Sequence, residues 1–131
     1  MAHDTATNTA MQPAIFRSVS DEAIDAVVRR TVVRSLARGR QLFRRGEPCQ
    51  GLYVVVDGAI RVYRGNQEGR EQTLHLQGPG QSIAEVPLFD GGTYPASARA
   101  DQDSRVLFLP LSDFQWLYRN HPEIAESVIR E

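Results

Sequence analysis

The spacing of hydrophobic residues follows a helical period near the start of the chain and then changes. Ile24, Val27 and Val28 fall on one helical face, and the preceding Ser18–Asp21 stretch offers hydroxyl and acidic groups for a helix start. We therefore predict a short amphipathic helix that ends near Arg30. Beyond it, β-branched and apolar residues are interrupted by glycines, which is typical of strands and turns.

The middle of the chain has the pattern of short strands. Leu52–Val56 is a continuous apolar run, Asp57-Gly58 is a tight-turn pair, and Ala59–Arg64 completes a predicted hairpin. Glu71–Gln77 alternates polar and apolar residues, and Ser97–Leu109 supplies the last strands around a polar turn. Turn signals that recur about every eight to twelve residues predict a sandwich or barrel. The fold class expected is mainly β with flanking helices.

A helical period returns near the end of the chain. Ser112 and Gln115 have the spacing of a capping box, and Phe114, Leu117 and Tyr118 are predicted to form the inward face of that helix.

A second helix is predicted to begin after His121-Pro122, because proline is favoured at the first helical position. Ile124, Val128 and Ile129 share one face of it, and no glycine or asparagine cap follows them. We expect the sequence to stop inside a longer helix.

Composition narrows the class of protein. The chain has 131 residues, 41% of them hydrophobic, and a formal net charge of −1. These values fit one globular domain, which we place at residues 15–131 after a flexible tail at residues 1–14. The start of the chain lacks the apolar stretch of a signal peptide, and no run is long enough to span a membrane, so a cytoplasmic location and no membrane partner are expected.

The cysteine and arginine positions indicate no specific metal or phosphate site. Cys49 is the only cysteine, so the chain can form neither an internal disulfide nor a cysteine-held zinc or iron–sulfur centre. Arginines are dense between residues 29 and 45, but no regular helical or strand spacing gathers all of them on one face. A solvated surface is the simpler interpretation, and a phosphate-binding stripe is the alternative.

The order of these elements resembles a known family. The chain resembles the sensor half of Crp/Fnr-type bacterial transcription regulators. The predicted order is a helix, a roll of short strands, a capped helix and the start of a long helix, and the stretches "LFRRGEPCQGLYVVVDGAIRVYR" and "IAEVPLF" occur at the corresponding places. The resemblance covers about Ile15 to Glu131. It implies a cyclic-nucleotide-binding-like β-roll, also described as a double-stranded β-helix or jelly roll.

The resemblance also implies a ligand site between Ser82 and Ala100. Nucleotide-binding members read roughly Gly-Glu-Leu, a short helix, then Arg-Ser/Thr-Ala; the glutamate accepts from a ribose hydroxyl and the arginine pairs with the phosphate. Here Glu85 matches the glutamate, but Tyr94 or, with a shift of one residue, Pro95 takes the arginine position. The ligand-binding residues expected from this match are Ile83, Ala84, Glu85, Val86, Tyr94, Pro95, Ala96 and Arg99.

The missing arginine makes classical cyclic AMP an unfavourable ligand. Arg99 and Arg61 are the candidates for a substitute cation, each on a strand where it faces either the roll or solvent. Glu85 as a helix cap and Tyr94 as a packing residue are the structural alternatives. The Tyr-Pro version resembles the branch of the family that answers nitric oxide, redox state or other non-nucleotide signals.

Some members of that branch use haem, so haem is a cofactor to consider. The chain has three histidines, of which His3 falls in the tail, His75 on a strand and His121 at a helix end, so direct support for haem is small. No other cofactor, no metal and no catalytic residue is predicted.

Three functions follow for comparison. The first is a small-molecule sensor that forms a homodimer through its last helix and reaches DNA only through a helix-turn-helix domain absent from these residues. The second, a cupin-type enzyme, needs several metal-binding histidines on adjacent strands, and only His75 lies on one, so the chain is expected not to be an enzyme. The third is a free-standing domain, either binding a cyclic nucleotide through a substitute arginine or acting as a dimerisation or interaction module with a vestigial pocket.

Overall fold

A computed structural model describes residues 20–83 and 92–123 of the chain. It contains, in order, α2 (Asp21–Arg30), β1 (Val32–Leu36), β2 (Gln41–Phe43), β3 (Gly51–Asp57), β4 (Ile60–Gly65), β5 (Glu71–Gln77), β6 (Ser82–Ile83), β7 (Ser97–Ala100), β8 (Ser104–Pro110) and α4 (Leu111–Asn120). The predicted tail, the residues Ala84, Glu85 and Val86, and the predicted apolar face of Ile124, Val128 and Ile129 lie outside the described residues.

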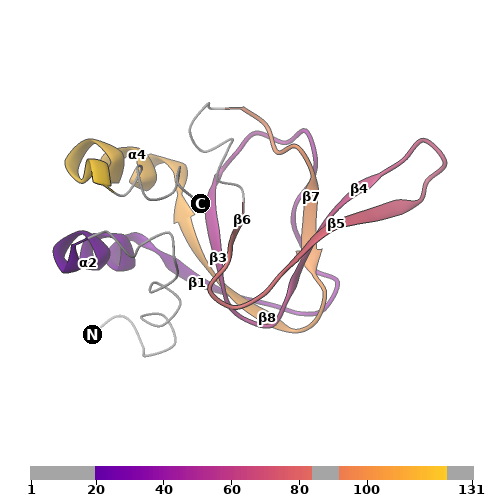
Figure 1. Ribbon diagram of the computed structural model, residues 1–131, viewed down its shortest axis with the longest axis horizontal. Coiled ribbons are helices and arrows are strands. Elements are labelled where there is room, and N and C mark those ends of the chain that lie inside the picture. The colour runs from indigo at the N-terminus through magenta and orange to yellow at the C-terminus, as the bar shows by residue number, and fades with distance from the viewer. Residues whose placement is uncertain (1–19, 84–91, 124–131) are drawn as a thin grey trace.

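The strands form two antiparallel four-stranded sheets that face each other as a roll (Figure 1). One sheet has the order β1-β8-β3-β6 and the other the order β2-β7-β4-β5. Apart from β4 and β5, paired strands are not consecutive in the sequence, so the roll closes through long-range pairing. This confirms the expected fold class of a mainly β roll with flanking helices.

The chain turns at Asp57-Gly58, where the sequence predicted a turn, but the predicted hairpin was wrong. β3 belongs to one sheet and β4 to the other, where β4 pairs with β5 and β7. Gly58 has φ +87°, and a Cβ at this position would collide with the Ser104 side chain and the Asp103 carbonyl. Glycine is therefore required here both for its backbone angle and for space. Ser104 Oγ, in turn, accepts a hydrogen bond from the Ala59 N–H at 3.0 Å, which ties the turn to β8.

Helix α2 begins and packs as predicted. The Ser20 hydroxyl accepts from the Ala23 N–H at 3.2 Å and caps the helix. The buried face is made by Ala23, Ala26, Val27 and Val28, and it joins the same hydrophobic core as the roll.

Helix α4 differs from the prediction in two respects. It begins directly after β8, with Pro110 at the N-cap and no side-chain cap, so the Ser112–Gln115 capping box was wrong. Because β8 ends at Pro110 and α4 begins at Leu111, Ser112 already lies in the first turn of the helix and cannot be its N-cap. Phe114 and Leu117 are buried as expected, but Tyr118 is 48% exposed. In the described part of the chain no helix is long and apolar enough to cross a membrane.

Candidate functional site around Tyr94

Tyr94 lies in the core of the roll. Its side chain is 1% exposed, and its ring stacks on Phe43 with centroids 3.8 Å apart and planes inclined by 13°. Its phenolic oxygen accepts a hydrogen bond from the Gln50 N–H at 2.9 Å. Its own backbone N–H donates to Glu47 O and its carbonyl accepts from the Gly46 N–H, both at 2.9 Å. Four groups, one from β2 and three from the β2–β3 connection, therefore fix this residue.

The Tyr94 hydroxyl carries no charge in this environment. Burial raises the pKa of Tyr94 to about 12, although the hydrogen bond from the Gln50 amide lowers it in part. The phenol therefore keeps its proton near neutral pH and offers a hydrogen-bonding dipole at most. The side chain of Tyr94 is therefore a neutral aromatic ring and not a cation.

The residues beside Tyr94 divide between core and surface. Ala96 and Ile83 are buried at 5% and 4% exposure, and Ile83 pairs with Tyr53 across β6 and β3. Pro95 is exposed, and its carbonyl accepts from Arg64 Nε at 3.0 Å. Sequence reasoning missed Arg64, because only the pairing of β4 with β7 brings the end of β4 to this segment.

Arg99 does not take the place of the missing arginine. Its neighbours Ala98 and Ala100 are buried, and side chains alternate along a strand, so Arg99 points to the opposite, outer face of the sheet. There its guanidinium forms two hydrogen bonds to the Glu71 carboxylate, at 2.8 and 2.7 Å. Arg61, opposite Arg99 in register, also contacts Glu71, at 3.3 Å. The expected substitute cations are thus already paired on the outside of the roll.

The pairing shifts the titration of both groups. The hydrogen bond from Arg99 is the main cause that lowers the pKa of Glu71, and the same bond raises the pKa of Arg99. The guanidinium of Arg99 also lies 4.6 Å from the centre of the Tyr63 ring. The outer cluster therefore pairs both guanidinium groups with the single Glu71 carboxylate on the outer face of the sheet.

Four aromatic side chains around Tyr94 were not recognised from the sequence as a unit. This aromatic cluster consists of Phe43, Tyr53, Tyr94 and Phe108, with Phe43–Tyr53 centroids 5.8 Å apart and Tyr53–Phe108 centroids 4.9 Å apart. Its members come from β2, β3, β8 and the segment before β7, so no local spacing could reveal it. The cluster occupies the volume inside the roll next to the expected ligand site.

The described residues do not fit a haem site. A haem needs an axial ligand that faces a large cavity, but His75 is exposed on β5, and neither His75 nor His121 lines either of the two cavities beside β1, of about 440 Å³ and 340 Å³. His121 instead ends α4, with its ring 6.1 Å from that of Trp116. Within residues 20–83 and 92–123, no three His, Cys, Asp or Glu side chains gather as a metal site.

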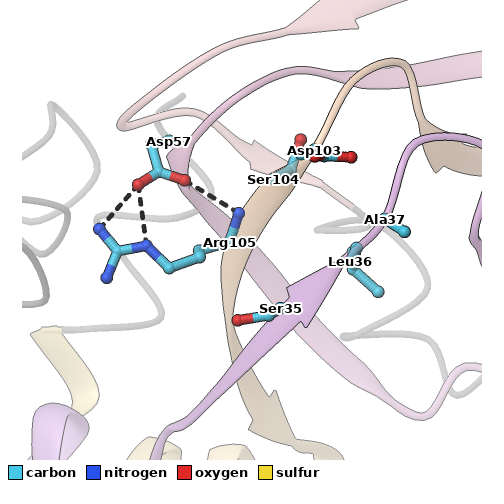
Figure 2. A pocket seen from close by; sticks show the side chains of 7 residues that line it. All are labelled: Ser35, Leu36, Ala37, Asp57, Asp103, Ser104 and Arg105. Atoms are coloured by element: carbon cyan, nitrogen blue, oxygen red, sulfur yellow. Dashed lines mark hydrogen bonds and ion pairs between the residues drawn. The ribbon is translucent and has the colours of Figure 1, made fainter.

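A cavity of about 440 Å³ lies at the opposite end of β3, as Figure 2 shows. Asp57 and Arg105 form its polar wall: Arg105 donates from Nε at 2.8 Å and from its backbone N–H at 3.0 Å to the two Asp57 oxygens. A third contact, at 2.7 Å, joins the terminal nitrogen of Arg105 to the same carboxylate. The Asp57 carboxylate and the Arg105 guanidinium pair with each other, and the exposed Ser35 and Asp103 also line this cavity.

Known proteins share this arrangement. The model of the cyclic nucleotide-binding domain matches residues 33–121. The cyclic AMP receptor protein of Thermus thermophilus is 33% identical over 114 residues, which are 87% of this chain and 53% of that protein. The N-terminal domain of a transcriptional regulator from Streptomyces coelicolor superposes with a TM-score of 0.81 and 32% identity, covering 93% of this chain and 85% of that one.

The crystal structure of the Thermus thermophilus catabolite activator protein superposes with a TM-score of 0.82 and 32% identity over 89% of this chain and 55% of that one. The chain spans about half the length of the curated relatives it matches. The matched segment contains α4 and nearly all of both sheets, including β2, whose Phe43 stacks on Tyr94. The chain belongs to the cyclic nucleotide-binding domain family and is homologous to the Crp-type regulators.

Proposed function

We propose that the chain is the ligand-sensing domain of a Crp-type transcription regulator whose signal is a small molecule other than cyclic AMP. Support for the regulator comes from relatives whose names describe transcriptional regulators, two of them cyclic AMP-activated. The observation that carries the choice of signal is the buried, uncharged Tyr94 at the arginine position.

The size of the effect can be worked from the missing contact. A hydrogen bond to a charged group contributes about 1.5–3 kcal/mol net, and every 1.4 kcal/mol corresponds to about tenfold in affinity. A cyclic nucleotide without the arginine should therefore bind roughly 10-fold to 150-fold more weakly than it does in a member that has it.

Ligand binding by the chain tests this proposal directly. Thermal unfolding is recorded with cyclic AMP, cyclic GMP and cyclic di-GMP up to millimolar concentration, because a ligand at 100 times its Kd adds about 2.7 kcal/mol of stability. We expect no stabilisation by cyclic AMP at micromolar concentration. Micromolar cyclic AMP binding that Glu85→Gln abolishes would overturn the proposal, since the family's ribose contact would then be in use.

Dimerisation and DNA binding belong to the same proposal. We place the dimer contact in the predicted helix that starts at Pro122 and DNA recognition in a domain outside this sequence. Sedimentation of the chain with and without residues 122–131 tests the first point, and a monomer in both cases contradicts it. A promoter-binding assay on the complete gene product tests the second.

One contact favours a second candidate, a cyclic-nucleotide sensor with a relocated cation. Arg64 Nε is held at 3.0 Å from the Pro95 carbonyl, immediately beside the position that lost its arginine. If this guanidinium takes over the phosphate contact, cyclic AMP binds and Arg64→Gln weakens it at least about tenfold. Arg70→Gln, which removes an exposed arginine in the β4–β5 turn, is the matched control and should leave binding unchanged.

A further inference from the structure

A second cavity, of about 340 Å³, opens between β1 and β2, the edge strands of the two sheets. Leu36, Leu42 and Val106 form its apolar wall, and Arg34 and Arg40 lie on its rim. No acidic side chain is among its lining residues. The cavity therefore combines two cations with an apolar surface, at the small end of the size range of ligand sites, roughly 300–1,000 Å³.

Arg34 is held in position by the aromatic cluster. It lies opposite the buried Val106 in the β1–β8 register, so its side chain projects to the same face as Val106, into the roll. Its guanidinium lies 4.2 Å from the centre of the Phe108 ring, and that ring packs against the buried Tyr53. A guanidinium fixed over an aromatic ring loses less freedom when it pairs with an anion.

Arg40 approaches from the other side of the opening. It follows the tight turn at Gly39 that joins β1 to β2, and its backbone N–H donates to Ala37 O at 2.9 Å. Among the residues that the structure describes, neither Arg34 nor Arg40 forms an ion pair, whereas Arg61, Arg99 and Arg105 are all paired with carboxylates. The two unpaired guanidinium groups leave an excess of positive charge at one opening.

We propose that this cavity is a binding site for a small organic anion, a carboxylate or phosphate ester with a short apolar body. Arg34 and Arg40 hold the anionic group, because a guanidinium presents paired donors that match a carboxylate or phosphate. Leu36, Leu42 and Val106 cover the apolar body. None of the residues that line the cavity comes from the Tyr94 segment, but Tyr53 of the aromatic cluster is among them, so the cavity adjoins the core around Tyr94.

The test uses the intact chain and two simple probes, hexanoate and inorganic phosphate, titrated at constant ionic strength and followed by amide chemical shifts. We expect saturable shifts at residues of β1 and β2, and a Kd that rises about tenfold or more in Arg40→Gln. Arg34→Lys, which keeps the charge and loses the planar fork, should weaken binding as well. Arg38→Gln is the matched control, because it removes an equal charge from the same turn but lines neither cavity.

Each result decides the question. Saturation by hexanoate alone assigns a carboxylate with an apolar body, and saturation by both probes assigns the anionic group as the main contact; both outcomes support the site. Unsaturable shifts with both probes would overturn it. Equal weakening in Arg40→Gln and Arg38→Gln would overturn it too, because the attraction would then come from the general charge of the turn. Arg40 lies on an exposed turn, so its variant tests the site without disturbing the core.

Discussion

Replacement of Tyr94 separates the two roles that the structure gives its side chain. Tyr94→Phe removes only the hydroxyl and leaves the Gln50 N–H without its 2.9 Å acceptor. Loss of a partner for a buried donor costs about 1–3 kcal/mol, and the Gln50 amide is only partly buried, so we expect about 1 kcal/mol. Tyr94→Ala also removes the ring that stacks on Phe43, and large-to-small aromatic changes in cores cost about 3–5 kcal/mol.

Urea unfolding followed by circular dichroism measures both changes, and a double-mutant cycle isolates the stack. The free energies of unfolding of Phe43→Leu, Tyr94→Leu and the double variant are compared. We expect a coupling free energy of about 0.5–1.5 kcal/mol, which is the contribution of an aromatic pair beyond its buried area. A cost for Tyr94→Ala no greater than that of Tyr94→Phe, or a coupling near zero, would refute the view that this ring is part of the core. Tyr94 would then have to be assigned to the ligand instead.

Three further changes test other parts of the structure. Burial raises the pKa of Tyr94 to about 12 from 10.0, so the folded state keeps this proton at pH values where the unfolded state loses it. The free energy of unfolding should therefore fall as the pH rises above 10. Tyr94→Phe should flatten that fall in alkaline unfolding curves. Gly58→Ala should destabilise the fold by roughly 1–3 kcal/mol in thermal unfolding. Gly69→Ala, at φ +81° but with open space, should cost less, and equal costs would show that the steric clash at Gly58 is unimportant. Arg99→Gln should raise the pKa of Glu71 in a carbon-detected NMR titration, and an unchanged titration would contradict the ion pair. The stabilisation from this pair is present at neutral pH and is lost as the pH falls through the lowered pKa of Glu71.

The loss of one cation has a wider consequence for how this domain holds a ligand. Arg99 and Arg61 share Glu71 on the outer face, and Arg105 pairs with Asp57, so the charged side chains of the central strands are committed to one another. The two proposed phosphate or anion contacts use other arginines. These are Arg64 beside Pro95, and Arg34 and Arg40 at the β1–β2 opening. Binding measurements on their variants distinguish a relocated phosphate contact from a separate anion site.

Local chemistry in the sequence was enough to determine the elements of this protein. The Asp57-Gly58 turn, the strand Glu71–Gln77 and helix α2 each depend on residues a few positions apart, and each is present in the structure. The alternation in Glu71–Gln77 gives no buried face, because β5 is an edge strand on which Leu74 and Leu76 are 38% and 57% exposed. The start of α4 was not determined in this way, because β8 continues to Pro110 and leads directly into the helix.

The candidate site was determined only in outline. From the sequence, the family resemblance assigns the arginine position to Tyr94 or Pro95, since that comparison needs only residue identity and order. Whether Arg99 could replace that arginine depended on which face of β7 its side chain occupies. Whether Tyr94 faces a ligand or the core depended on its contacts with Phe43 and Gln50. Both lie more than 40 residues away in sequence, and the separation from Gln50 is 44 residues. The pairing of distant strands fixes these contacts, so the tertiary structure alone decided that the ring is buried and that Arg99 points outward.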